Sequence, residues 1–72
     1  MRSDAELQSD VLNELKRDER LRIKDLDVKV EGRVVTLSGS AETPRQRWRA
    51  LQLARSVAGI APVSDHIRLR AR

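Results

Sequence analysis

The sequence predicts a small α+β domain, a two-layer sandwich in which two helices pack on one face of a three-stranded mixed sheet. Two segments repeat apolar residues every three or four positions, which is typical of amphipathic helices. Three shorter segments alternate apolar and polar residues, which is typical of strands with one wet face. The segments follow the order helix, strand, strand, helix, strand. A chain of 72 residues has room for a single domain.

The first helix is predicted to start at Ser3, because Ser3 and Glu6 form a capping-box pattern. Leu7, Val11 and Leu15 then recur every four residues and mark the face that meets a core. The charged run at residues 16–20 is expected to end the helix in a loop.

A hairpin is predicted after this loop, with a tight turn centred on Glu31 and Gly32. This turn pairs Val28 with Val35 and gathers the apolar strand residues on one face. Those residues are Leu26, Val28, Val30, Val35 and Leu37. Because glutamate is a poor first residue for a turn of this kind, a longer loop is the alternative.

The second helix is predicted to begin at Thr43 and Pro44, with Gln46 completing a capping box, and to stop at Gly59. Its core-facing arc contains Ala50, Leu53, Ala54 and Val57, widened by Leu51 and Ala58. A last strand with Val63, Ile67 and Leu69 on its apolar side should follow a right-handed crossover and lie parallel to the second strand. The residues expected to be buried are Leu7, Val11, Leu15, Val28, Val35, Leu37, Leu53, Val57 and Ile67.

The composition limits the function. With 39% hydrophobic and 36% charged residues, and no run of about 20 apolar residues, the chain is expected to be soluble, without a transmembrane segment. The net charge of +4 is uneven: residues 1–36 carry 8 basic and 9 acidic side chains, and residues 37–72 carry 7 and 2. The second half therefore favours an anionic partner.

The sequence contains no pattern typical of a catalytic site, a metal site or a phosphate-binding loop. His66 has no second histidine or cysteine with which to share a metal, and Asp25 and Asp27 lack the rest of a calcium loop. The three glycines lie in separate turns and form no phosphate-binding loop. We therefore expect no metal, no cofactor and no enzymatic activity.

The start of the second helix is unusual. Arg45, Arg47 and Arg49 lie where the helix dipole disfavours cations by about 0.3–1 kcal/mol, and Trp48 falls outside the core arc. Such departures from local rules are expected at functional positions. The predicted binding residues for lipid or a partner are Arg45, Trp48, Arg49, Leu51 and Arg55. The alternative is that the arginines are a solvated face and that Trp48 extends the core.

Three stretches in this order and spacing resemble a BON domain from about Asp4 to Leu69: "SDAELQSDVLNEL", "DLDVKVEGRVVTLSGSA" and "ARSVAGIAPVSDHIRL". The resemblance implies the same α+β fold and a bacterial, usually envelope-associated module thought to bind phospholipid surfaces. Similar sequences often have small or acidic residues in the second helix, whereas this chain has arginines there and stays basic to Arg72.

These observations predict a non-enzymatic binding module, formed by residues 1–72, that associates with anionic phospholipid membranes through the second helix. The alternative is a protein-interaction module that docks to a partner or to a copy of itself along a strand edge. Nucleic acid is disfavoured, because there is one aromatic residue and no stacking platform. The expected state is a monomer or a weak self-associate. The resemblance implies a periplasmic or envelope location within a longer chain, whereas a complete chain without a signal peptide would be cytoplasmic.

Overall fold

The computed structural model describes residues 2–70, so Arg72 lies outside the described residues. The predicted order of helices and strands is confirmed. The elements are α1 (Asp4–Arg17), β1 (Ile23–Glu31), β2 (Val34–Ala41), α2 (Pro44–Ala58) and β3 (Val63–Leu69).

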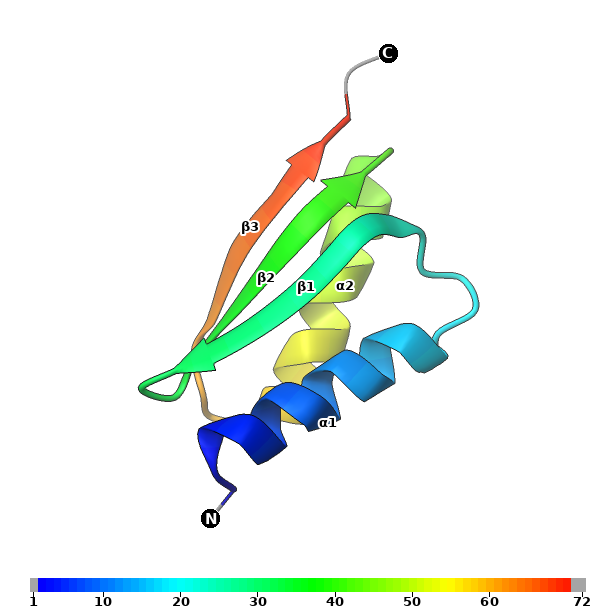
Figure 1. Ribbon diagram of the computed structural model, residues 1–72. Helices are drawn as coiled ribbons and strands as arrows, with labels where there is room; N and C mark the ends of the chain where they lie inside the picture. Colours follow the sequence, from blue (N-terminus) through cyan, green and yellow to red (C-terminus); the bar gives the residue numbers. More distant parts are fainter. Residues whose placement is uncertain (1, 71–72) are drawn as a thin grey trace.

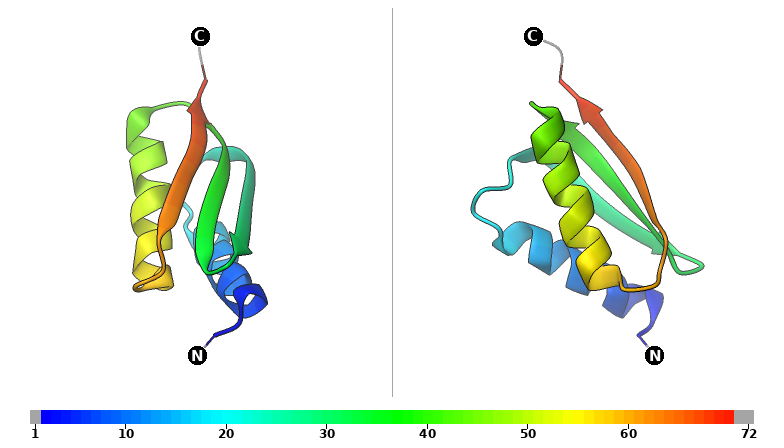
Figure 2. Two further views of the ribbon diagram at one scale, coloured as in Figure 1. Left: turned by 90° about the vertical axis from the view of Figure 1, so that its left-hand side faces the viewer. Right: turned by 180° about the vertical axis from the view of Figure 1, so that it is seen from behind.

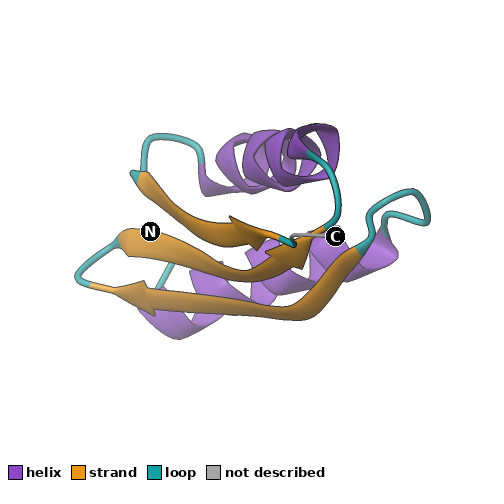
Figure 3. Ribbon diagram, turned by 90° about the horizontal axis from the view of Figure 1, so that it is seen from above, coloured by secondary structure: helices purple, strands orange, loops and turns teal. Residues whose placement is uncertain are grey.

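The sheet has the predicted mixed topology. β2 is the central strand, paired antiparallel with β1 and parallel with β3. The apolar residues of both helices pack in one core with those of the sheet, and no helix within residues 2–70 covers the other face (Figure 1). In Figure 3, which looks down on the molecule, one helix lies along one side of the strands and the other passes beneath them. In the right-hand view of Figure 2, α2 lies in front of the sheet and β3 lies to the right of β2, which is the predicted right-handed crossover.

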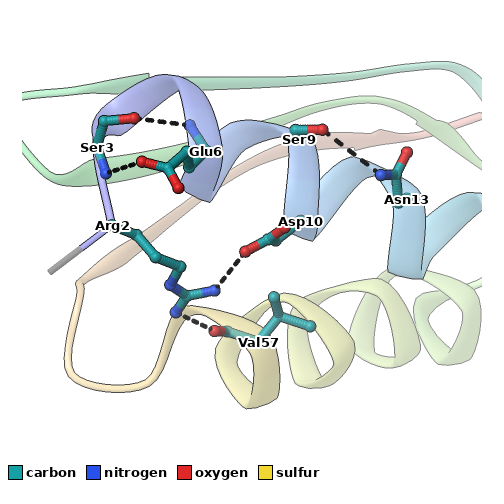
Figure 4. Close-up of polar contacts among 7 residues, drawn as sticks. All are labelled: Arg2, Ser3, Glu6, Ser9, Asp10, Asn13 and Val57. Atoms are coloured by element: carbon teal, nitrogen blue, oxygen red, sulfur yellow. Dashed lines mark hydrogen bonds and ion pairs between the residues drawn. The ribbon is translucent and has the colours of Figure 1, made fainter.

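α1 begins as predicted. The Ser3 hydroxyl accepts the Glu6 N–H, and the Glu6 carboxylate accepts the Ser3 N–H, both at 3.1 Å (Figure 4). Arg2 ties this end of α1 to the C-terminal end of α2. Its guanidinium pairs with the Asp10 carboxylate at 2.9 Å and donates to the Val57 carbonyl at 2.7 Å. A cation at the carbonyl end of a helix is favoured by the helix dipole.

The hairpin register differs from the prediction by two residues. Gly32 and Arg33, with φ of 53° and 67°, form the centre of the turn in place of Glu31 and Gly32. Two central residues with positive φ are typical of a type I′ turn. Val30 therefore pairs with Val35, and Val28 with Leu37. Because side chains alternate with a period of two, a two-residue shift leaves the predicted buried face unchanged.

β1 begins at Ile23, three residues before the predicted strand residue Leu26. The pairing shifts between Lys24 and Asp27, where Asp25 has a φ of 55°, which marks a β-bulge. Leu26 lies in this bulge and is only half-buried.

The core lies between the sheet and the helices. Seven of the nine residues predicted to be buried are buried, but Leu53 and Val57 are half-buried at its rim. The buried centre of α2 consists instead of Ala50, Ala54 and Ala58. Small side chains at this spacing let the helix backbone lie close to its neighbours. The full set of buried residues is Leu7, Val11, Leu15, Val28, Val30, Val35, Leu37, Ala41, Ala50, Ala54, Ala58 and Ile67.

Candidate functional site

α2 carries the predicted site, and its N-terminus is fixed by contacts with the loop after α1. The Thr43 hydroxyl accepts the Gln46 N–H at 3.2 Å, which is one half of the predicted capping box. The other half is replaced by tertiary contacts. The Gln46 side chain accepts the Arg22 N–H at 2.7 Å and donates to the Arg20 carbonyl at 3.0 Å. Gln46 thereby fastens the start of α2 to residues 20–22.

Trp48 lies on the outer face of α2 and is 62% exposed. This confirms the predicted exposure and excludes Trp48 as a core residue in this structure. The ring stands between two hollows of the surface. One is lined by Arg20, Arg45, Gln46, Trp48 and Arg49. The other is lined by Pro44, Arg45, Arg47, Trp48, Leu51 and Asp65.

Two of the three N-terminal arginines of α2 pair with carboxylates on other elements. The Arg49 guanidinium contacts one oxygen of Asp18 through Nε at 2.9 Å and Nη2 at 2.8 Å. Arg47 Nε lies 3.6 Å from Asp65 Oδ2 on β3. Their placement near the positive end of the helix dipole is therefore offset by these ion pairs.

Arg45 and Arg55 are exposed, and the polar contacts of residues 2–70 include no ion pair for either side chain. Leu51 is half-buried and packs against the core, so it supports the surface beside Trp48. α2 contains four arginines and no acidic residue. The structure thus brings Arg45 and Trp48 together, places Arg55 farther along the helix, and holds Arg49 at Asp18.

Two exposed residues near α2, Arg20 and Ile60, were not among the residues that the sequence predicted for the site. Arg20 reaches the hollow beside Trp48 from the loop after α1, and no local pattern indicates that approach. Ile60 is fully exposed just after α2. Ile60 lies between Gly59 and Ala61, outside any periodic segment. The one feature of the sequence that could have indicated its exposure is a large apolar residue in a turn.

The pKa of the Asp18 carboxyl is lowered, first by its hydrogen bond from Arg49 and then by the Arg20 N–H. Because the folded pKa lies below the unfolded one, the stabilisation is complete above the unfolded pKa and is lost as pH falls through the folded pKa. The pKa of Glu6 is lowered in the same direction by its bonds from Ser3.

We therefore expect the melting temperature to fall as pH is lowered from about 6 to about 3. This dependence should be weaker in Asp18→Asn than in the wild type, because the variant lacks the carboxylate whose pKa is lowered by Arg49. Thermal unfolding followed by circular dichroism measures both. An equal pH dependence in Asp18→Asn and the wild type would contradict this role of Asp18.

Neither a metal site nor a membrane-spanning helix is found among the residues that the structure describes. His66 contacts the Ser64 hydroxyl at 3.0 Å on the open face of the sheet. Within residues 2–70, no three His, Cys, Asp or Glu side chains are grouped to hold a metal ion. Neither described helix has the length and apolar character needed to cross a bilayer.

Comparison with known proteins identifies the family. The family model for the BON domain matches residues 3–71. The chain is also 36% identical over 52 residues to the osmotically-inducible protein Y of Escherichia coli (strain K12). That match covers 72% of this chain and 26% of the relative, so the chain spans about a quarter of the relative's length. The family match and the observed α-β-β-α-β fold lead to one conclusion: the chain belongs to the BON domain family.

Proposed function

We propose that this BON domain is a non-enzymatic module that associates peripherally with anionic phospholipid membranes through the outer face of α2. The observation that carries the proposal is an exposed tryptophan on a helix with four arginines and no acidic residue. Tryptophan rings favour the interface between headgroups and acyl chains, and each arginine near an anionic surface contributes about 1 kcal/mol.

The two exposed arginines have separate places on this face. Arg45 lies beside Trp48, and Arg55 lies two turns farther along α2. Both can meet lipid phosphates without breaking an ion pair found among the described residues. Arg49 stays with Asp18 and fixes the helix to α1, and Leu51 supports the ring from the core side.

The family supports a location in the bacterial envelope, with the periplasm as the proposed compartment. The E. coli relative is named as osmotically inducible, and its greater length is consistent with a BON domain acting as one module of a larger protein. We propose the same modular use here. A partner protein is the second candidate, favoured by the open edge of β3.

Trp48→Ala is expected to abolish sedimentation with vesicles of phosphatidylcholine and phosphatidylglycerol while leaving the melting temperature nearly unchanged. The ring is 62% exposed, so its removal should cost little folding energy. Val34→Ala is the matched control, because Val34 is also an exposed apolar residue but lies on β2. It should bind as the wild type does.

The charge is tested in the same assay. Arg45→Gln and Arg55→Gln should each weaken binding several-fold, as expected from about 1 kcal/mol per arginine. Arg17→Gln removes the same charge from the exposed end of α1 and should change binding less. Equal losses in Arg17→Gln and Arg45→Gln would show that net charge, and not the α2 face, governs binding.

A further inference from the structure

β3 is an edge strand whose outward backbone groups can be identified. The Pro62 carbonyl accepts the Val35 N–H at 2.9 Å, and the Arg70 N–H donates to the Ala41 carbonyl at 2.8 Å, so both face β2. Backbone groups of successive strand residues point to opposite sides. The even-numbered residues between them therefore face β2. The residues that face outward are Val63, Asp65, Ile67 and Leu69.

The centre of this edge already binds a carboxylate. Asp65 Oδ1 accepts the outward N–H of Ile67 at 2.9 Å, and Asp65 Oδ2 lies 3.6 Å from Arg47 Nε. Residue Asp65 is exposed overall although its side chain is only 24% exposed, so the backbone here faces solvent. One N–H and one guanidinium thus form a carboxylate site that the chain fills with its own side chain.

A hollow lies beside this edge on the helix side of the sheet. It has a volume of about 410 Å³ and is lined by Pro44, Arg45, Arg47, Trp48, Leu51 and Asp65. The left-hand view of Figure 2 shows α2 running alongside β3. On the open face of the sheet, Arg68 and Arg70 are exposed near the same edge. A strand added to β3 would therefore meet cations on both faces and an apolar wall on the helix side.

We propose that the β3 edge and the hollow beside Trp48 bind an extended acidic segment of a partner protein by strand addition. The segment's carbonyl accepts the Ile67 N–H, and one of its carboxylates replaces Asp65 at Arg47. Its apolar side chains on the helix side contact Trp48 and Leu51. Main-chain hydrogen bonds give affinity in this mode of recognition, and alternate side chains give specificity.

The other edge of the sheet is less suited to strand addition. The Val30 N–H of β1 already donates to the Gln8 side chain of α1 at 3.3 Å, and the bulge at Asp25 interrupts the strand. Strand edges protected in these ways resist pairing. If the acidic segment came from a second copy of this chain, that segment would have to be β1, whose edge is protected in these ways. We therefore assign the β3 site to a different protein.

The test uses an acetylated, amidated six-residue peptide of two glutamates, two valines and two glutamates, so that each face of the added strand carries both residue types. A peptide with glutamine in place of every glutamate is the neutral control. Hydrogen exchange followed by NMR should show slower exchange at the amides of Val63, Asp65, Ile67 and Leu69 when the acidic peptide is added. The amides of Ser64, His66 and Arg68, which face β2, should change little. This odd–even pattern separates strand addition from membrane contact, which involves α2.

Asp65→Ala should tighten binding of the acidic peptide about tenfold. The Asp65 carboxylate competes with the peptide for the Ile67 N–H and Arg47, and its removal is expected to be worth about one charge-assisted hydrogen bond. Arg47→Gln should weaken binding about tenfold, and Arg17→Gln should leave it unchanged. Asp65→Asn, whose amide oxygen can still accept the Ile67 N–H, provides a second variant if Asp65→Ala does not fold. It should tighten binding less than Asp65→Ala.

Three results would overturn the proposal. The first is that millimolar acidic peptide leaves the hydrogen-exchange rates of the outward β3 amides unchanged in an Asp65 variant that is folded. The second is equal binding of the neutral and acidic peptides. The third is protection of the outward amides that rises with protein concentration without peptide, which would make a second copy the occupant. Vesicle binding by α2 succeeds or fails independently of all three.

Discussion

Leu37→Ala is expected to destabilise the domain by about 2–5 kcal/mol, a large fraction of the stability expected for so small a domain. Leu37 is fully buried on the central strand, and truncating its side chain leaves a cavity in the hydrophobic core. A domain of this size has a total stability of about 4–11 kcal/mol, at about 0.05–0.15 kcal/mol per residue. Urea unfolding followed by circular dichroism measures the loss.

Leu69→Ala is the matched control for Leu37→Ala. Leu69 is 44% exposed near the end of β3, so the same truncation there should cost well under half as much. If Leu37→Ala unfolds at the urea concentration of the wild type, Leu37 does not lie in the core and the strand assignment is wrong.

Gly39→Ala is expected to have the second large effect, because the backbone and the neighbouring strand both require glycine. Gly39 has a φ of 139°, and an added Cβ would lie 2.8 Å from Ile23 Cγ2 and 2.9 Å from the Lys24 carbonyl oxygen. The carbonyl belongs to the backbone beside the bulge and cannot move aside cheaply. Backbone strain of about 1–3 kcal/mol and crowding of about 1–3 kcal/mol should both reduce stability.

Gly32→Asn serves as the control for Gly39→Ala. Gly32 also has a positive φ, of 53°, but nothing lies within 4 Å of an added Cβ, and asparagine tolerates this conformation. Thermal unfolding should therefore show a small change for Gly32→Asn and a large one for Gly39→Ala. The opposite order would contradict the close approach of β1 and β2 at the bulge.

Features that depend on neighbouring residues in the sequence were predictable. The Ser3 and Glu6 capping box fixes the start of α1, and the Thr43 and Pro44 pair fixes the start of α2, through contacts within one turn. The order and the buried faces of the strands follow from their periodicity. Trp48 was predicted to be exposed because the helical projection places it opposite the core, and the structure agrees.

Features that depend on tertiary contacts or on backbone conformation were not predictable. A period-two pattern is unchanged by a two-residue shift, so it could not choose between a turn at Glu31–Gly32 and one at Gly32–Arg33. The arginines of α2 posed a similar problem. Asp18 lies 31 residues before Arg49, and a local reading of the helix contains no sign of their contact.

Because these tertiary contacts cannot be inferred from the sequence, the structure changes which arginines belong to the proposed site. From the sequence, Arg45, Arg47 and Arg49 formed one group of cations with no compensation. In the structure Arg47 and Arg49 meet Asp65 and Asp18, which leaves Arg45 as the exposed cation beside Trp48. The proposed membrane face is thus smaller than the sequence suggested, and the carboxylate site on β3 comes from one of these pairs.

The most direct test of the proposed function is the emission of Trp48, which is the only tryptophan of the chain. Vesicles containing phosphatidylglycerol should shift this emission to the blue, and vesicles of phosphatidylcholine alone should not. Raising the salt from about 0.01 M to about 1 M shortens the screening length from about 30 Å to about 3 Å and should reverse the shift. Unchanged emission of the folded protein with the anionic vesicles at low salt would contradict membrane binding through α2.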